Sequence, residues 1–243
     1  MQEHLEALEK ERKVRILYAC ESGSRAWGFA SQDSDYDVRF LYVHPAEHYL
    51  SFRIEQKRDV IEVPLEGDLD LNGWDLRKAL QLLVKSNGAL VEWLTSPIVY
   101  RDGLHGLRQR LPELVSPRAL GFHYFRMARA AVADLADQQA SLKRCFYALR
   151  PLLAARWLEL RPGLPPVALA GLRAVLPDGL QPTVDALLER KLASSEKDRQ
   201  QLDPELLEFL RAESDRLGGV VARLSAVVPD LELLDGFFRE ALG

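Results

Sequence analysis

Residues 23–37 read GSRAWGFASQDSDYD, and this stretch decides the fold expected of the chain. The apolar run at residues 15–20 precedes it and predicts a buried strand that ends in a tight turn. A second apolar run at residues 36–43, stopped by Pro45, predicts the next strand. The stretch therefore connects two strands, with a Gly-Ser turn at its start and an Asp-Tyr-Asp triplet at its end.

Asp35 and Asp37 are the chemically informative residues of this stretch. They are two residues apart, so in a strand they point to the same face, with Cα atoms about 6.6 Å apart. Carboxylates held about 4 Å apart repel each other by roughly 4 kcal/mol at an effective dielectric of about 20. Divalent cations offset that repulsion, and hard oxygen ligands suit Mg²⁺ or Mn²⁺. Asp70, between Leu69 and Leu71 in a strand-like alternation, has the right type and context to complete the site.

The Gly-Ser turn predicts a second kind of contact. Ser24 and the backbone N–H groups of a turn at a helix N-terminus form an anion site that suits phosphates. Gly23 and Gly28 have the glycine spacing of a P-loop. However, Phe29 and Ala30 stand where that motif requires Lys and Ser or Thr, which excludes a P-loop.

Other residues near these motifs have competing interpretations. Asp33 and Asp68 each lie two residues before a proposed ligand, so a register error would exchange them for Asp35 and Asp70. Asp75 is better explained as the acid of a helix cap, because Asn72 three residues earlier resembles the first residue of a capping box. Tyr36 alternates away from the carboxylates and is expected in the core.

The remaining periodicities predict an α+β fold in two parts. Further strands are expected at residues 59–63 and 68–71, which can pair as neighbours, and helices at residues 1–13, 72–85 and 89–94. Residues 98–100 read as a final short strand or an extended linker. From about residue 112 onwards helical spacing dominates, at residues 121–137, 141–160, 182–192 and 204–227. We therefore expect a small mixed-sheet domain at residues 1–110, followed by an all-helical domain at residues 111–243.

Composition sets the outer limits of this interpretation. The chain has 243 residues, with 32 Lys and Arg against 36 Asp and Glu, and 47% of its residues are hydrophobic, which excludes disordered, collagen-like and coiled-coil classes. No run approaches the roughly 20 apolar residues of a membrane helix. The N-terminus lacks the apolar stretch of a signal peptide, so a cytoplasmic location is expected. Cys20 and Cys145 read as reduced core thiols.

The motifs together resemble the DNA polymerase beta nucleotidyltransferase superfamily. Its hallmark is a Gly-Ser turn, a spacer of about ten residues and an acidic-apolar-acidic triplet, with a third acidic residue on a later strand. The chain is also similar to the predicted nucleotidyltransferases associated with RNA ligase and RNA repair. That similarity covers most of residues 14–160 and is carried by residues 22–28, 34–37, 74–78, 92–94, 96–100 and 143–150.

The resemblance implies a transferase that moves a nucleoside monophosphate from an NTP such as ATP to an acceptor hydroxyl, with an RNA 3′ end as the first candidate. It implies two-metal catalysis with Mg²⁺ or Mn²⁺ at Asp35, Asp37 and Asp70, and makes residues 1–110 the catalytic domain. It also suggests an RNA ligase as a functional partner. The nucleotide-binding residues that it implies are Gly23, Ser24, Arg25, Arg77, Lys78 and Lys143.

Two other functions remain open on the same residues. Some relatives that act as antitoxins or modify proteins transfer the nucleotide to a protein hydroxyl (AMPylation), through a site that would look the same. The chain could also be a catalytically silent nucleotide-binding module with a regulatory role. That function predicts Asp70 far from Asp35 and Asp37, whereas metal bound by all three would argue against it.

Overall fold

The structure of the chain is a computed structural model that describes residues 1–31, 34–63, 67–135, 139–193 and 199–243. Asp33 lies outside these described residues. The chain divides into two compact units. Residues 1–26, 35–115 and 228–243 form the first, which we call the sheet unit, and residues 27–34 and 116–227 form the second, the helical unit.

The sheet unit is built on five strands in the order β3-β4-β2-β1-β5. The central strands β2 and β4 run parallel, and every other neighbouring pair is antiparallel, so the sheet is mixed as expected. The predicted second strand, at residues 36–43, agrees with β2 at both ends. The strands are β1 (Arg15–Glu21), β2 (Tyr36–Val43), β3 (Val60–Glu62), β4 (Leu69–Asp75) and β5 (Val99–Asp102).

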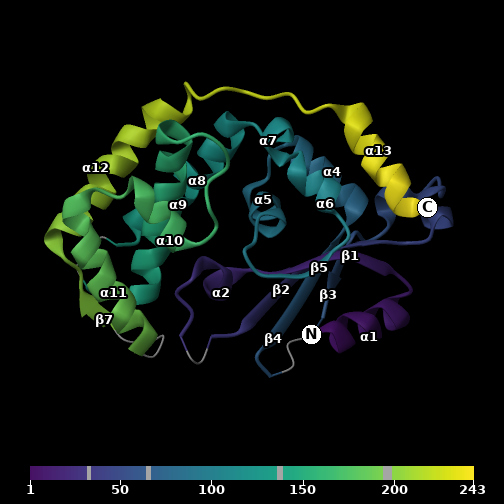
Figure 1. Cartoon of the computed structure of the whole chain (residues 1–243), viewed down its shortest axis with the longest axis horizontal. Coiled ribbons are helices and arrows are strands. Elements are labelled where there is room, and N and C mark those ends of the chain that lie inside the picture. The colour runs from purple at the N-terminus through teal and green to yellow at the C-terminus, as the bar shows by residue number, and fades with distance from the viewer. Residues whose placement is uncertain (32–33, 64–66, 136–138, 194–198) are drawn as a thin grey trace. The chain divides into compact units, whose positions relative to one another are not determined.

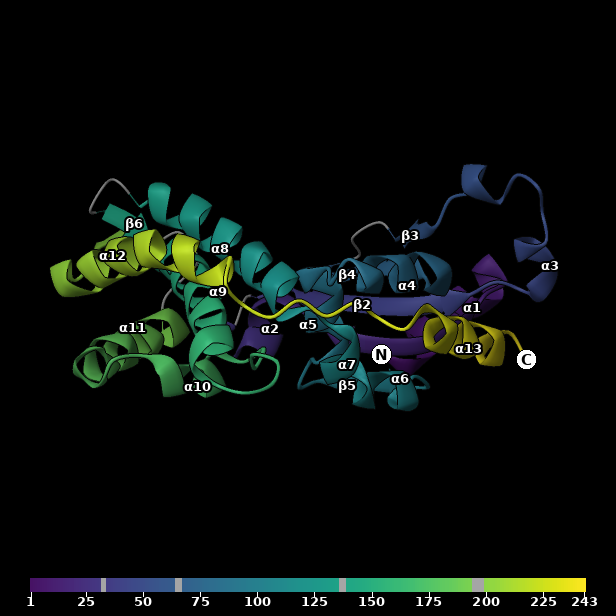
Figure 2. The ribbon, with the colours of Figure 1, turned by 90° about the horizontal axis from the view of Figure 1, so that it is seen from above.

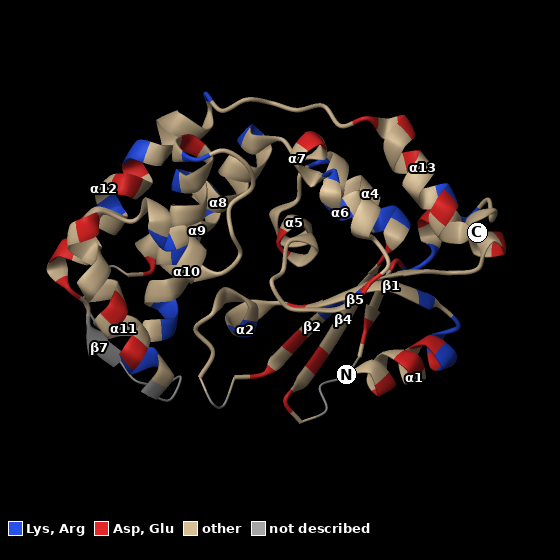
Figure 3. Ribbon diagram, in the orientation of Figure 1, with Lys and Arg blue, Asp and Glu red and all other residues tan. Residues whose placement is uncertain are grey.

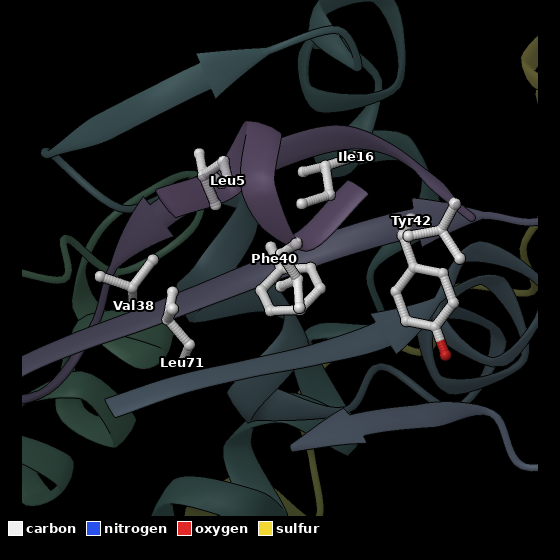
Figure 4. Packing of buried hydrophobic residues seen from close by; sticks show 9 residues of the cluster. Leu5, Ile16, Val38, Phe40, Tyr42 and Leu71 are labelled. Atoms are coloured by element: carbon white, nitrogen blue, oxygen red, sulfur yellow. The ribbon is translucent and has the colours of Figure 1, made fainter. Parts of the chain in front are cut away.

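Helices cover both faces of this sheet. Helix α1 (Gln2–Arg12) lies on one face, and α4 (Leu76–Val84) and α5 (Gly88–Leu94) lie on the other (Figure 1). Val38, Phe40 and Tyr42 of β2 point toward α1 and pack in one buried cluster with Leu5 (Figure 4). Because side chains alternate along a strand, Asp37 and Arg39 must point to the opposite face.

The remaining helices of the sheet unit are short, except for the last. They are α2 (Gly23–Trp27), which crosses into the helical unit, α3 (Ala46–Tyr49), η1 (Ile54–Gln56), α6 (His105–Gln109), α7 (Leu111–Leu114) and α13 (Leu231–Leu242). Helix α13, which the sequence did not predict, packs against α4 of the same unit. Helix α13 also contacts α3, where Phe238 forms an edge-to-face pair with Tyr49, with ring centroids 5.1 Å apart.

The predicted helix start at Asn72 is wrong. Strand β4 continues to Asp75, because β2 pairs with it on one side and β3 on the other. Asp75 is itself the N-cap of α4, and its Oδ1 accepts a hydrogen bond of 2.8 Å from the backbone N–H of Arg77. Gly73 belongs to the strand, where an added Cβ would lie 2.0 Å from the Phe40 ring.

The helical unit consists mainly of packed helices (Figure 2). Helices α8, α9 and α12 pack against one another, and Ser116, Ser141 and Asp203 cap their N-termini with side-chain oxygens. The elements are α8 (Pro117–Ala133), α9 (Leu142–Leu160), α10 (Leu169–Leu172), η2 (Arg173–Val175), η3 (Asp178–Leu180), α11 (Gln181–Ala193) and α12 (Pro204–Val221). A two-stranded antiparallel sheet of β6 (Gln139–Ser141) and β7 (Arg199–Gln201), not predicted from sequence, joins them.

The unit division differs in detail from the predicted domains. Residues 228–243 belong to the sheet unit and residues 27–34 to the helical unit. This division by contacts does not test whether the catalytic domain ends at residue 110, so that boundary stays a prediction. Cys20 and Cys145 are buried free thiols. Among the described residues, no helix combines the length and apolar character needed to cross a membrane.

Candidate active site

The parallel pairing of β2 with β4 brings two of the predicted carboxylates together. In this register Asp37 lies directly opposite Asp70, one residue into each strand. Figure 3 shows acidic residues in red on both β2 and β4. Asp37 points away from the α1 face, and Trp74, on the same face of β4 as Asp70, packs against Trp93 of α5. Both aspartates therefore face the α4–α5 side, where their side chains retain 31% and 36% exposure.

Arg39 joins these two carboxylates. Its Nη2 lies 3.0 Å from Oδ1 of Asp37 and 2.8 Å from Oδ2 of Asp70. Its Nη1 also donates to the backbone oxygens of Val38 and Asp70, at 3.2 and 3.4 Å. Sequence reasoning missed this arginine, although the two-residue period places it on the same face as Asp37.

Gly23 lies against the other oxygen of Asp37. Its φ is +59°, and a Cβ at this position would lie 2.0 Å from Oδ2 and 2.8 Å from Cγ of Asp37. Both observations require glycine here. The backbone N–H of Ser22 donates to the Asp37 carbonyl at 2.8 Å, which ties the start of the turn to the strand.

A buried acid, Glu21, holds the backbone of Asp37 from β1. Its Oε1 accepts a 2.8 Å hydrogen bond from the Asp37 N–H, and its Oε2 accepts one from the Tyr100 hydroxyl. Burial raises the pKa of Glu21, and the nearby Asp37 charge raises it further, although the two hydrogen bonds act in the opposite direction. The sequence signal for Glu21 was an acid closing an apolar strand just before the Gly-Ser turn.

Arg25 and Asp35 lie together at the edge of this cluster. Asp35 is exposed and immediately precedes β2, and its carbonyl accepts a hydrogen bond of 3.1 Å from Nε of Arg25. The Arg25 guanidinium also lies over the Tyr36 ring, 3.8 Å from the centroid. Tyr36 is 43% exposed, so its predicted core position is wrong; it supports an arginine at the surface instead.

The chain matches a known family over nearly its whole length. The model of the RNA repair pathway DNA polymerase beta family covers residues 1–240. The chain belongs to this family. It is also 43% identical, over 235 residues, to the uncharacterized protein YcgL of Bacillus subtilis (strain 168), and the match covers 94% of this chain and 90% of that protein. Family membership makes the chain a nucleotidyltransferase-like protein of the polymerase beta type, as its motifs predicted.

A solved structure, a nucleotidyltransferase-like protein from Exiguobacterium sibiricum 255-15, is similar over 91% of this chain and 75% of its own. The identity is 17% and the TM-score is 0.34, which is too low to carry a structural argument.

Two of the other basic residues that the family resemblance implied, Arg77 and Lys78, lie away from this cluster within the sheet unit. Arg77 and Lys78 follow the far end of β4, and the five residues from Asp70 to Asp75 span about 16 Å in an extended strand. Arg77 pairs there with Glu55, and Lys78 lies 2.8 Å from a carboxylate oxygen of Asp59. Lys143 belongs to the helical unit, with its ammonium 6.0 Å from the centroid of the Tyr147 ring.

The donor set suits the divalent metal on which polymerase beta-type nucleotidyltransferases generally rely. Within the described part of the chain, no group of three or more His, Cys, Asp or Glu is arranged to hold a metal ion. One observation nevertheless fits a cation here: Asp37 and Asp70 already share a positive group, Arg39.

Proposed function

We propose that the chain transfers a nucleoside monophosphate from an NTP to an acceptor hydroxyl, with an RNA 3′ end as the first candidate acceptor. In this proposal Asp35, Asp37 and Asp70 hold Mg²⁺ or Mn²⁺. The observation that carries it is the parallel register that sets Asp37 opposite Asp70. Gly23 packs against Asp37 so closely that any larger residue there would displace the Asp37 carboxylate. Bound metal would supply activation of the attacking hydroxyl and stabilisation of the leaving pyrophosphate.

The residues of the chain prepare this site before any substrate arrives. Glu21 accepts from the N–H of Asp37, and Ser22 donates to its carbonyl, so both backbone groups of Asp37 are bonded. This fixes the direction of its side chain, as two-metal chemistry requires. Tyr100 in turn donates to Glu21, so β5 supports the carboxylate through one intervening residue.

Gly23, Ser24 and Arg25 are the residues we propose for the triphosphate. Gly23 and Ser24 form the turn beside Asp37, and Arg25 stands next to Asp35, where a guanidinium can neutralise phosphate charge. Arg77, Lys78 and Lys143 stay predictions as phosphate contacts. A functional link to an RNA ligase and a cytoplasmic location also stay predictions.

The test is a transfer assay with labelled NTPs, Mg²⁺ and RNA bearing a 3′-hydroxyl. Asp37→Asn and Asp70→Asn should each lower the transfer rate by on the order of 10² to 10³, the usual cost of losing one electrostatic contact to developing charge. Asp68→Asn is the matched control, because Asp68 is exposed and lies two residues before Asp70. If Asp68→Asn lost activity while Asp70→Asn kept it, the proposed ligand set would be wrong.

The acceptor needs a separate measurement. A labelled nucleotide on extended RNA supports the first candidate. If mass spectrometry instead finds the nucleotide on a co-expressed protein and the RNA is unchanged, the proposed reaction stands, but the acceptor is a protein hydroxyl. Nucleotide binding with no transfer to either acceptor would indicate the regulatory module instead.

A further inference from the structure

We infer that Arg39 is a resident cation of the site: it holds Asp37 and Asp70 together while metal is absent, and it must give up at least one of them before metal binds. Arg39 is therefore a positioning residue that weakens metal binding. This inference deepens the proposed function and rests on it, because it assumes that the two aspartates are metal ligands.

The geometry of the guanidinium carries the inference. Arginine commonly binds one carboxylate through two parallel hydrogen bonds. Arg39 instead presents a single nitrogen to two carboxylates, with Nη2 3.0 Å from Asp37 and 2.8 Å from Asp70. A positive group between two carboxylate oxygens from neighbouring strands occupies the place that a bridging cation would take.

The surroundings hold the guanidinium in that place. Nη1 donates to the carbonyls of Val38 and Asp70, so the backbone of both strands contributes. The Arg39 side chain is only 17% exposed, which limits its alternatives. Position 39 lies two residues after Asp37 on the same face of β2, so β2 itself delivers this charge to the carboxylates.

Charge arithmetic sets the direction of the effect. Without a cation, Asp37 and Asp70 would face each other as like charges, which is unfavourable in the metal-free chain. A divalent ion brings twice the charge of Arg39. However, the guanidinium already occupies the site, and its positive charge repels the incoming ion. Removing the positive charge should therefore destabilise the metal-free protein and strengthen its binding of metal.

The experiment measures Mn²⁺ binding to the full chain by electron paramagnetic resonance, without nucleotide or RNA, together with thermal unfolding in the presence of EDTA. Arg39→Met keeps an unbranched, flexible stem and removes the guanidinium with its charge. We expect it to bind Mn²⁺ at least ten-fold more tightly than the wild type, to unfold at a lower temperature in EDTA, and to gain more stability from Mn²⁺. Arg39→Lys keeps the positive charge that opposes the metal, so it should bind Mn²⁺ within about three-fold of the wild type.

Arg101→Met is the matched control. Arg101 lies on β5 of the same sheet, forms an ion pair of 2.8 Å with Glu9, and is 24% exposed. Its loss should affect stability and leave the affinity for Mn²⁺ unchanged. If Arg39→Met does not fold, Arg39→Gln, which keeps hydrogen-bond donors without the charge, replaces it in both measurements.

The outcomes separate this inference from the proposed function. Asp37→Asn and Asp70→Asn should weaken Mn²⁺ binding if the metal site is correct. If they do, but Arg39→Met binds Mn²⁺ equally or more weakly, Arg39 assists the ligands and only the inference is overturned. If the aspartate variants leave Mn²⁺ binding unchanged, or neither the wild type nor Arg39→Met binds Mn²⁺, the metal site and the inference are both wrong.

Discussion

Two arginine–carboxylate clusters, one in each unit, look alike and differ in charge balance. In the sheet unit, Arg39 serves both Asp37 and Asp70. In the helical unit, Arg216 binds both oxygens of Glu159 and also bridges to Glu213. Glu213 receives a second guanidinium from Arg156, so this cluster has two arginines for two glutamates.

The difference teaches how to tell a structural cluster from a functional one. In the helical unit, hydrogen bonds from Arg216 lower the pKa of Glu159; burial acts to raise the pKa of Glu213, but hydrogen bonds from Arg216 and Arg156 outweigh it. The charges of this cluster balance, and they join two packed helices, α9 and α12, so packing alone accounts for them. The sheet cluster puts two aspartates on one guanidinium, and a positive-φ glycine packs against one of them. That excess of negative charge fits a further cation.

The largest expected effect is on transfer activity, and it should separate the two clusters completely. Asp70→Asn should reduce the transfer rate by on the order of 10² to 10³. Glu159→Gln, which alters the same kind of contact in the helical unit, should leave the rate within about two-fold, because surface ion pairs contribute little beyond local stability. Steady-state kinetics on both variants, with unfolding monitored by circular dichroism, checks this. Equal losses in both would remove the distinction between the clusters.

Gly23→Ala should be the most damaging substitution outside the carboxylates. Its φ of +59° strains any other residue, and its Cβ would overlap Oδ2 of Asp37. We expect a loss of about 1–3 kcal/mol in the free energy of unfolding and a large loss of transfer activity. Gly67→Ala is the control, because Gly67 has a φ of +62° in the same unit, but an added Cβ there meets no atom of the described residues within 4 Å.

Gly67→Ala should therefore show only the backbone strain, about 1 kcal/mol, with activity retained. Urea denaturation and the transfer assay measure both quantities. Should the two glycine variants lose activity equally, the close approach of residue 23 to Asp37 would have no role in the site.

Some parts of this site can be predicted from the sequence, and others depend on the tertiary structure. The Gly-Ser turn, the strand at residues 36–43 and the third aspartate follow from local patterns, because alternation and turn residues are visible in one segment at a time. Arg39 could be placed on the correct face, but its bridge to Asp70 depends on the register between β2 and β4. That register is set by a crossover through β3 and by packing, neither of which a local pattern contains.

Tertiary pairing also explains the errors in the fold. Residues 72–75 resemble a helix cap when read alone, yet β2 and β3 bind their backbone on both sides and keep them in a strand. Helix α13 has a clear apolar face, but only its packing on α4 assigns it to the sheet unit. Arg77 and Lys78 are separated from Asp70 by the extra length of that same strand.

Arg216→Met should give a smaller effect, confined to stability. The Glu213 side chain is 7% exposed and would keep Arg156 as a partner, so complete loss of its counter-charge is avoided. We expect the free energy of unfolding to fall by about 1–3 kcal/mol, the cost of losing hydrogen bonds to a charged group. Transfer activity measured at a temperature well below unfolding should be unchanged. A loss of activity in this folded variant would show that the balanced cluster also serves the reaction.

The smallest effect is the opposite pH dependence of two buried glutamates. The pKa of Glu213 is lowered in the folded chain, so its stabilising contribution is present above its unfolded pKa of about 4.3 and is lost as the pH falls through the folded value. The pKa of Glu21 is raised, so the folded chain binds the extra proton, and stability is lost as the pH rises through the folded value.

Glu213→Gln and Glu21→Gln should therefore change the pH profile of stability in opposite senses. Relative to the wild type, Glu213→Gln should lose most stability near neutral pH. The loss should be small in acid, because at acid pH the wild type itself loses the ionised Glu213 that the two arginines contact. Glu21→Gln keeps the acceptor for the Asp37 N–H, and its stability relative to the wild type should improve as the pH rises from the unfolded pKa through the raised folded pKa of Glu21. Urea denaturation from pH 4 to pH 8 measures both, with differences of about 1 kcal/mol expected. Parallel profiles for the two variants would mean that the carboxylate beside Asp37 is as well compensated as the one held by two arginines.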